Sequence, residues 1–583
     1  MTRPGTPQAV VVGAGPVGLT AAHELARRGV AVRLVDAADG PALISRAVAV
    51  HPRTLETFAQ MGIVDELLPR GRRNRAFTMY AGGRRLVRLE ADYSSMPTSY
   101  PYTLIAGQKD TEAVLRLAVA RLGVQIEWGT RLTSFEQDEE RVLLRLEREG
   151  RTEVVETSWL VGCDGGHSTV RKQLGLELIG ESSERWMLAD APVDTDLPPD
   201  TIYWAHTGDQ ALMMVPYARE GRWRLLDTAP AEDAADITAV EAARRLGAKL
   251  SAGLGRTVRV GEPEWTSVFT FQQRMVERMQ QGRVFVAGDA AHVHSPASGQ
   301  GMNTGVQEAY NLAWKLAQVE QGHAGRALLD SYSHERVPVG RKLLGSTRTA
   351  TFLVQLKNLL ASAALPVVFS LVRTLRPLRK AIQRKVLGGM SGLRIGYPGS
   401  PLTHLDSYHY VCGLGPVAVA GTLPASHSRP HPRPGERVTA APVHDPHAPG
   451  CRALHEELRD PRWTLLLAAG GSGPGDVPVG TAVTAAVQYG EWLSVRTVGG
   501  EPADGPAPLA DPGAALRRAL GLTAGCWLLV RPDGYVAARG GVLTRPALER
   551  ALAPLGLATR LAGEARREPD LALPTLVPRS KEL

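Results

Sequence analysis

Between residues 9 and 36 the apolar positions change their spacing twice. Residues 9–12 form a continuous apolar run, which is typical of a short buried strand. After a glycine-rich turn, residues 19–28 carry apolar side chains with a period near 3.6, and residues 30–35 form a second short apolar run. Strand, helix and strand in this order predict a βαβ unit.

From residue 181 to residue 275 apolar and polar positions alternate instead. The segments 201–206, 211–216 and 222–226 are rich in Trp and Met and have a period near two. This pattern predicts an antiparallel sheet. A Pro-, Gly- and His-rich stretch at 421–435 predicts a connector that leads to a separate α/β module.

Further short runs predict the elements around this sheet. The expected elements are a helix at 113–122 and strands at 124–128, 142–146 and 158–163, then strands at 463–467, 482–487 and 527–530 and helices at 511–520 and 545–552. A chain of 583 residues exceeds one ordinary core, so roughly two to four domains are expected.

The composition is that of a globular protein, with 44% hydrophobic and 22% charged residues. The formal net charge of +8 is spread along the chain, and no zinc-ligand spacing, RNA-binding motif or basic helix accompanies it. We therefore expect no nucleic-acid partner. The charge favours mild steering of anionic cofactors, or it reflects an Arg-rich composition.

Four scattered cysteines without a Cys-x-x-Cys motif predict a reducing compartment, and Cys526 is expected to be isolated and buried. The N-terminus lacks the basic region and cleavage site of a secretory signal. The longest apolar stretch, 351–372, is interrupted by Gln, Lys, Asn and Pro and makes a poor membrane span. A cytoplasmic protein with no membrane partner is expected.

The turn inside the βαβ unit carries the spacing of a dinucleotide-binding fingerprint. Gly13 permits a tight turn, Gly15 lets a pyrophosphate approach the backbone, and Gly18 lets the helix pack close to the strand. The expected contacts are Gly13, Gly15, Pro16, Val17, Gly18 and Asp36. Asp36 ends the second strand and favours FAD or NAD over NADP, although a solvated strand-end acid is an alternative interpretation.

This turn alone does not distinguish NAD from FAD, but two later segments do. Segment 161–171 contains Asp164-Gly165-Gly166 after an expected strand, and it includes Arg171. Segment 282–292 contains an expected strand that ends in Gly288-Asp289, where a carboxylate is placed to bind a ribityl hydroxyl. The start of the following helix, where N–H groups favour an anionic ring, contributes Pro296, Gly299, Gly301, Met302 and Asn303.

With these three motifs in order, the chain resembles the flavoprotein aromatic hydroxylases related to para-hydroxybenzoate hydroxylase. It is most similar to the polyketide and phenol hydroxylases that carry a thioredoxin-like C-terminal domain. The resemblance implies an α/β fold with a Rossmann-type FAD-binding domain, an antiparallel β substrate domain and a thioredoxin-like α/β domain. The implied ranges are 1–180 plus 276–345 for FAD, 181–275 for substrate, 346–400 for long linking helices and 401–583 for the C-terminal domain.

The resemblance also implies the reaction. FAD would be bound, NADPH or NADH would be a transient co-substrate, and O₂ would form a flavin C4a-hydroperoxide that hydroxylates a polycyclic, polyketide-like aromatic substrate. Two alternatives stay open: Baeyer–Villiger or antibiotic-inactivating oxygenation on the same fold, and a non-catalytic flavoprotein that binds a polycyclic intermediate. Antibiotic biosynthesis is the implied context.

Several site residues are carried over by the same resemblance. Arg46 matches the arginine beside the isoalloxazine, and is the one candidate for a catalytic role, while Gln108 matches a glutamine near the ribityl chain. Asp164 and Arg171 inherit a mixed role at the FAD pyrophosphate and the NAD(P)H approach. Ser298 stands where the family commonly has glycine, and Glu308 where it has Asp.

The substrate is expected between the flavin and the 181–275 sheet. The candidates for its lining are Trp204, Met213, Met214, Pro216, Trp223 and Trp265. His292 and His294, two residues apart, do not share a helix face, so no metal is expected, and His292 is expected in the flavin-side turn. Without Cys-x-x-Cys, the C-terminal module is expected to be structural or dimer-stabilising, in a monomer or homodimer.

Overall fold

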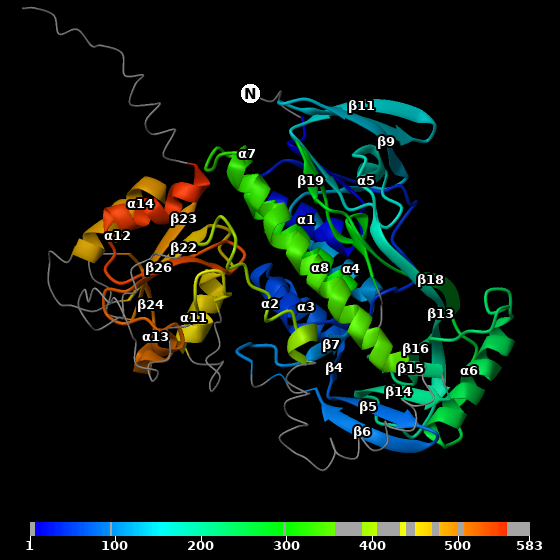
Figure 1. Ribbon diagram of the computed structural model, residues 1–583. Coiled ribbons are helices and arrows are strands. Elements are labelled where there is room, and N and C mark those ends of the chain that lie inside the picture. The colour runs from blue at the N-terminus through cyan, green and yellow to red at the C-terminus, as the bar shows by residue number, and fades with distance from the viewer. Residues whose placement is uncertain are drawn as a thin grey trace, which may run out of the picture.

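The computed structural model describes residues 6–91, 93, 96–208, 210–294, 299–355, 387–404, 432–438, 449–468, 477–499 and 506–556. In Figure 1 an N-terminal sheet and its helices lie in the middle of the molecule. A larger sheet with α6 (Ala239–Leu254) lies at one end, and the C-terminal module lies on the other side of α7 (Gly301–Glu320) and α8 (Ala327–Gln355).

Six strands form the N-terminal sheet, in the order β19-β20-β12-β1-β2-β8. They are β1 (Ala9–Val12), β2 (Val32–Val35), β8 (Ile126–Glu127), β12 (Trp159–Gly162), β19 (Gln280–Gln281) and β20 (Val284–Val286). All neighbouring pairs are parallel except β19 with β20. The chain leaves β1 toward β2 and later returns to β12 on the opposite side, which creates a topological switch point between β1 and β12.

Helices cover this sheet and bury its apolar strands. They are α1 (Pro16–Arg27), α2 (Pro52–Gln60), α3 (Val64–Leu67), α4 (Gln108–Arg121) and α5 (Thr169–Gln173), together with α7 and α8. α1 packs between α7 and α4, and all four residues of β1 are buried. The predicted βαβ unit is confirmed, with a helix that begins at Pro16, whose fixed φ suits the first helical position.

Nine strands form the larger sheet, in the order β21-β18-β13-β16-β15-β14-β5-β6 with β17 beside β13. They are β5 (Ala76–Ala81), β6 (Arg84–Glu90), β13 (Ile179–Asp194), β14 (Thr201–Thr207), β15 (Gln210–Pro216), β16 (Arg222–Asp227), β17 (Arg259–Val260), β18 (Trp265–Met275) and β21 (His292–Val293). Strands β14–β16 confirm three predicted segments. Three strands of this sheet lie outside the expected range 181–275: β5, which pairs with β14 in parallel, β6, which pairs with β5, and β21, which pairs with β18.

Two three-stranded sheets complete this part of the chain, in the orders β11-β10-β9 and β3-β7-β4. Their strands are β3 (Ala49–Val50), β4 (Arg72–Asn74), β7 (Thr103–Ile105), β9 (Thr130–Gln137), β10 (Val142–Arg148) and β11 (Arg151–Thr157). The short sheet β3-β7-β4 brings the segment before α2 next to the start of α4.

The C-terminal module is a five-stranded sheet, in the order β24-β23-β22-β25-β26, with helices on it. Its elements are α11 (Pro449–Glu457), β22 (Trp463–Ala468), α12 (Val477–Tyr489), β23 (Leu493–Val498), β24 (Pro508–Leu509), α13 (Ala515–Ala519), β25 (Trp527–Val530), β26 (Val536–Gly540) and α14 (Arg545–Leu552). The predicted strand at 482–487 is wrong, because this Ala-rich run lies inside α12, where its period suits a buried helix face.

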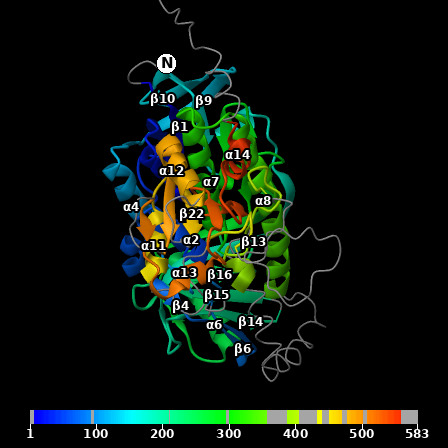
Figure 2. The same cartoon turned by 90° about the vertical axis from the view of Figure 1, so that its left-hand side faces the viewer.

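The module packs directly on α7. The indole rings of Trp314 in α7 and Trp463 in β22 lie edge to face, with centroids 5.5 Å apart, inside one apolar cluster. Both views place the module against α7 (Figures 1 and 2).

Cys526 is disulfide-bonded, so the prediction that it is isolated is wrong.

Some predictions fall outside the described residues. Of the expected long helices at 346–400, α8 extends to Gln355, and residues 356–386 are not among the described ones. Most of the connector at 421–435 also lies outside them.

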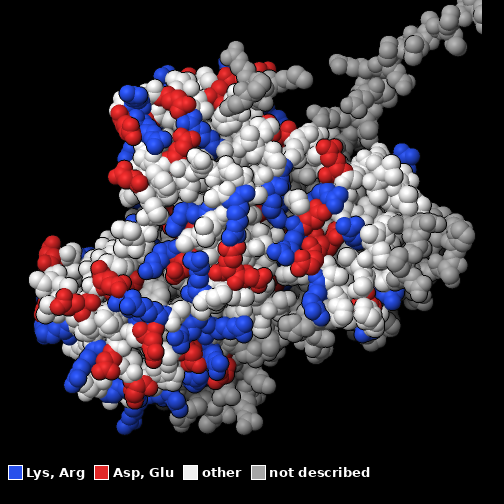
Figure 3. Space-filling model, turned by 180° about the vertical axis from the view of Figure 1, so that it is seen from behind, with Lys and Arg blue, Asp and Glu red and all other residues white. Residues whose placement is uncertain are grey.

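Figure 3 shows Lys and Arg interspersed with Asp and Glu over one face of the molecule, so the net positive charge does not gather there in one patch.

Candidate cofactor and substrate site

Three glycine-bearing turns follow three neighbouring parallel strands. The first turn (13–18) follows β1, the second turn (163–166) follows β12, and the third turn (287–289) follows β20. The Cys163 N–H donates to the Val12 carbonyl at 2.8 Å, and the Ala287 N–H donates to the Gly162 carbonyl at 3.0 Å. The three motifs therefore meet at one sheet edge, where α/β sheets bind their ligands.

The first turn is closed at two of its glycines and open at the third. Cβ atoms on Gly13 and Gly18 would overlap the carbonyl oxygens of Cys163 and Gly13, whereas a Cβ on Gly15 would meet nothing within 4 Å. The start of α1 has Pro16 in its first turn and neither a side-chain cap nor an acid there, among the residues that the structure describes. An uncapped helix start beside open space fits a pyrophosphate.

Asp36 connects the end of β2 to the first turn. Its carboxylate oxygens accept hydrogen bonds from the Ala14 N–H at 2.6 Å and the Ala38 N–H at 2.8 Å. Each carboxylate oxygen has further acceptor capacity. A ribose contact by Asp36 is thus compatible with its place in the fold.

Asp164 in the second turn caps a helix. Its carboxylate accepts from the Ser168 hydroxyl at 2.5 Å and from the Thr169 N–H at 2.7 Å, at the start of α5. Gly165 has a φ of +76°, and a Cβ there would meet nothing within 4 Å. The backbone of the second turn is therefore open to a ligand at Gly165, while the Asp164 side chain stabilises the turn through its hydrogen bonds.

Arg171 is buried and links the second turn to the third. Its guanidinium donates to the Gly166 carbonyl at 2.8 Å and to the Ala290 carbonyl at 3.4 Å. Arg171 therefore lies inside the fold, between the two turns, and not on the surface.

In the third turn, Gly288 has a φ of +62° and lies so close to Val17 that a Cβ would come within 2.8 Å of that side chain. The first and third turns thus touch. Asp289 is exposed to solvent, yet surrounding protein raises the pKa of its carboxyl, while the nearby His292 and Arg46 charges oppose this rise. An accessible but desolvated carboxylate is what the wall of a concave ligand site provides.

Glu308 of α7 holds the third turn from behind. It accepts from the Gly288 N–H at 2.9 Å and contacts the His292 ring at 2.8 Å, and both side chains are fully buried. Burial alone would raise the pKa of Glu308, but His292, Arg336 and the Gly288 N–H lower it below its ordinary value. A charged Glu308 is therefore built into the turn, and His292 is its partner.

The start of α7 approaches the same place. It has neither a side-chain cap nor an acidic residue in its first turn within the described part of the chain. Gly299 has a φ of +61°, and Gly301 lies against His294. Met302 is buried, and Asn303 donates to the carbonyls of Ala49 and Gly299 at 2.8 and 2.7 Å. Asn303 therefore orients the loop, while Pro296 and Ser298 lie outside the described residues.

The loop that carries Arg46 is bonded to Gln108 at the start of α4. The Gln108 N–H donates to the Ala47 carbonyl at 2.9 Å, and the Ala47 N–H donates to the Gln108 side-chain oxygen at 3.1 Å. The Arg46 side chain is exposed, and its charge acts on Asp289. Gln108 thus fixes the loop that presents Arg46 to the third turn.

The candidate substrate residues divide between the two faces of the larger sheet. Trp204, Met213 and Trp265 belong to an apolar cluster with Ala49 and Ile105, on the side of the Arg46 loop. Met214 and Trp223 pack beneath α6 on the opposite face, because successive strand residues alternate. These two candidates therefore do not share a face of the sheet with Trp204, Met213 and Trp265. Pro216 lies at the end of β15, opposite Trp223.

Arg224 and Asp190 form a buried pair that no sequence motif marks. The guanidinium contacts the carboxylate at 2.5 and 2.9 Å, and it also donates to the Ser45 and Arg46 carbonyls at 2.5 and 3.2 Å. Trp265 donates to the same carboxylate at 2.9 Å. The pair therefore connects the sheet to the Arg46 loop, and only long-range pairing reveals it.

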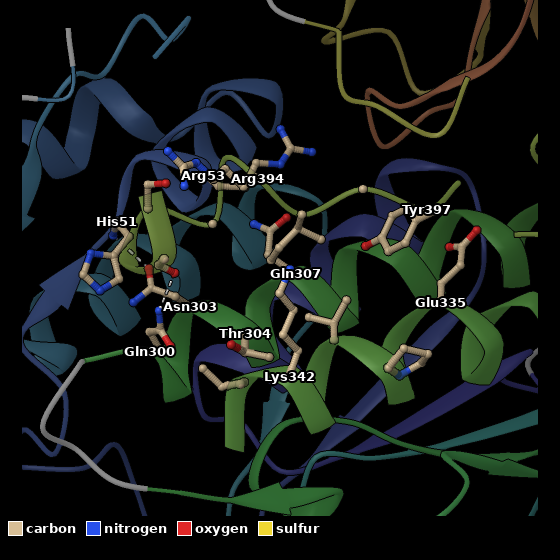
Figure 4. A pocket seen from close by; sticks show the side chains of 18 of the residues that line it. His51, Arg53, Gln300, Asn303, Thr304, Gln307, Glu335, Lys342, Arg394 and Tyr397 are labelled. Atoms are coloured by element: carbon tan, nitrogen blue, oxygen red, sulfur yellow. Dashed lines mark hydrogen bonds between the residues drawn. The ribbon is translucent and has the colours of Figure 1, made fainter. Parts of the chain in front are cut away.

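A cavity of about 560 Å³ lies between α2, α7, α8 and the segment 388–400. Figure 4 shows His51, Gln300 and Asn303 at one end of it and Glu335 and Tyr397 at the other. None of the predicted substrate residues lines this cavity.

Neither a metal centre nor a membrane span emerges from the described ranges. No group of three or more His, Cys, Asp or Glu side chains there is arranged to hold a metal ion. None of the helices searched there combines the length and the apolar character required to cross a bilayer.

The chain is similar to known proteins over most of its length. Residues 6–347 match the family model of the FAD binding domain. The 6-methylpretetramide 4-monooxygenase of Streptomyces rimosus is 49% identical over 92% of this chain and 91% of its own length. The solved flavin-dependent monooxygenase PieE, in complex with FAD and substrate, is 26% identical over 96% of this chain and 100% of its own, with a TM-score of 0.75. Aklavinone-11 hydroxylase, with FAD and aklavinone, is 25% identical over 95% and 100%, with a TM-score of 0.72.

The fold and the three converging turns define a flavoprotein monooxygenase of the para-hydroxybenzoate hydroxylase type. By the family match and its full-length relatives, this chain belongs to the FAD binding domain family, as an FAD-dependent monooxygenase. The resemblance inferred from the three motifs is confirmed.

Proposed function

We propose that this chain hydroxylates a polycyclic, polyketide-like aromatic substrate, with FAD as bound cofactor, NADPH or NADH as reductant and O₂ as oxidant. The observation that carries the proposal is the convergence of three turns beside the Arg46 loop and an apolar aromatic sheet face. The relative that is 49% identical is named for a monooxygenation of 6-methylpretetramide, which supports this substrate class.

The residues around the turns have distinct tasks in this proposal. The open backbone at Gly15 and the start of α1 hold the pyrophosphate, Asp36 binds the ribose, and Asp289 binds the ribityl chain. The N–H groups at the start of α7 stabilise negative charge on the ring. When bound, FAD supplies the redox and oxygen-transfer chemistry.

The side chains around the proposed FAD site determine which molecules reach the flavin ring. Arg46 flanks the site with a positive charge. Trp204, Met213 and Trp265 form an apolar surface that suits a flat aromatic substrate and excludes water. The buried Arg224–Asp190 pair fixes the position of the Arg46 loop relative to this apolar surface.

We also propose the thioredoxin-like assignment of 401–583 and the domain ranges given above. The order β23-β22-β25-β26, with a parallel first pair, antiparallel later pairs and a final helix α14, supports it. A cytoplasmic location and a monomeric or homodimeric state stay predictions.

The test is NADPH and NADH oxidation by the purified holoenzyme with tetracyclic aromatic polyketides and with simple phenols. The proposal predicts that a tetracyclic substrate stimulates oxidation and yields a ring-hydroxylated product. A lactone product would instead indicate Baeyer–Villiger oxygenation. Flavin binding without stimulation by any polycyclic compound would indicate a non-catalytic binder.

A further inference from the structure

The turn Arg531-Pro532-Asp533 follows β25 in the C-terminal module and is buried in the core of the molecule. The Arg531 and Asp533 side chains are only 1% and 3% exposed, although both are charged. The Arg531 guanidinium lies 5.3 Å from the ring centroid of Trp314 and 5.2 Å from that of Tyr397. A charged turn at this depth requires partners from the surrounding helices.

Glu335 of α8 is the principal partner. It accepts from Arg531 at 2.6 and 2.9 Å, from the Lys315 ammonium at 2.8 Å and from the Ser400 hydroxyl at 2.6 Å. Asp533 accepts from Arg531 at 2.6 Å and from Asn311 at 3.1 Å. Two buried cations and two buried carboxylates thus balance across the boundary between the module, α7 and α8.

The next residue of α8, Arg336, reaches in the other direction. Its guanidinium donates to the Tyr397 hydroxyl at 2.9 Å and to the Thr304 carbonyl at 3.2 Å, and it lies 3.6 Å from the Glu308 carboxylate. Glu308 in turn accepts from the Gly288 N–H at 2.9 Å. Glu335 and Arg336 are consecutive residues of α8. Glu335 therefore contacts the Arg531 turn, while Arg336 contacts Glu308, which supports the third turn.

We propose that the buried Arg531 turn is a positioning element for FAD. It fixes α8 against α7, and through Arg336 and Glu308 it fixes the Gly288–Asp289 turn in the geometry that binds the cofactor. This assigns the C-terminal module a task that the proposed function does not include. The inference requires FAD binding at the third turn but does not depend on the identity of the substrate.

If the Arg531 turn only anchored the C-terminal module, its loss would affect stability and FAD binding differently. Loss of such an anchor lowers the stability of the fold but leaves the affinity of the folded protein for FAD unchanged. A positioning element changes the affinity and the reduction potential of bound FAD in protein that is still folded. FAD affinity at equilibrium therefore separates the two roles.

The experiment compares R531M with R545M in the full chain. Arg545 is the matched control, because it lies in the same module and pairs with Glu549 on the exposed face of α14. Dissociation constants for FAD are measured by quenching of flavin fluorescence, and circular dichroism verifies the fold. We expect FAD affinity to fall about tenfold or more in R531M and in E308Q, and R545M to stay within about twofold of wild type.

Folded R531M with FAD affinity and reduction potential equal to wild type would overturn the proposal. If R531M does not fold, Y397F decides, because it removes only the hydroxyl that accepts from Arg336. We expect weaker FAD binding by about threefold or more in Y397F, and unchanged binding would overturn the proposal. Wild-type protein that binds no FAD would contradict the proposed function instead.

Discussion

At the scale of single residues, Gly15 and Gly18 are glycines for different reasons. Gly18 packs against the backbone of Gly13, where any Cβ would overlap a carbonyl oxygen. Gly15 has an extended backbone with φ −74° and open space around the position of a Cβ. The protein alone would tolerate a side chain at residue 15, and the proposed approach of a pyrophosphate to this backbone accounts for the glycine.

This difference gives a paired prediction. G15A should leave the stability of the apoprotein within about 1 kcal/mol of wild type, since alanine adopts this conformation without strain. Its FAD affinity should fall at least about tenfold, because the methyl group occupies the place of the pyrophosphate. Chemical denaturation of the apoprotein and FAD titration provide the two measurements.

G18A is the control, and it should destabilise the apoprotein itself. G15A with normal FAD affinity would show that the pyrophosphate does not approach this turn.

At the scale of elements, local pattern predicted the strands and helices that have a strong period and clear turn signals. The βαβ unit and β14–β16 are of this kind. The apolar run at 482–487 predicts a strand but lies in a helix, because a short apolar run fits a buried helix equally well. Strand β5 joins the larger sheet through pairing with β14, more than a hundred residues away, and β6 joins it through β5. No local signal in the sequence indicates the pairing of β5 with β14.

The two faces of β15 give the second prediction. M213A should change the KM for a polycyclic substrate by about threefold or more, because Met213 lies on the face near the Arg46 loop. M214A should lower the free energy of unfolding by about 2–5 kcal/mol, since Met214 is fully buried beneath α6.

The KM of folded M214A should equal that of wild type. Steady-state kinetics and urea unfolding distinguish the two variants, and a KM effect confined to M214A would place the substrate on the other face.

Strand β14 carries a pH-sensitive residue. Burial lowers the pKa of His206 from 6.5 to about 4, so between these values the unfolded chain binds a proton that the folded chain does not. Stability should therefore fall as pH decreases from about 6.5 to about 4, by up to about 3 kcal/mol from this residue. Urea unfolding of H206Q should show a smaller loss over this range, and an unchanged pH dependence would contradict the assignment.

At the scale of the whole molecule, the candidate site divides into a part that motifs predicted and a part that they did not. The three turns carry glycines and acids at fixed offsets from strands, and parallel strand ends bring them together. The pairs Arg224–Asp190 and Arg531–Glu335 join residues 34 and 196 positions apart. Charged side chains of this kind are common on surfaces, so nothing local distinguishes a buried pair before the fold is known.

Incorporation of labelled oxygen tests the central claim most directly. The holoenzyme is incubated with NADPH, a tetracyclic aromatic polyketide and ¹⁸O₂, and the product is analysed by mass spectrometry. We expect one atom of ¹⁸O in a new ring hydroxyl of each product molecule, and no label when only the water is enriched. A product whose new oxygen comes from water, or NADPH oxidation that yields only hydrogen peroxide with every polycyclic substrate, would contradict it.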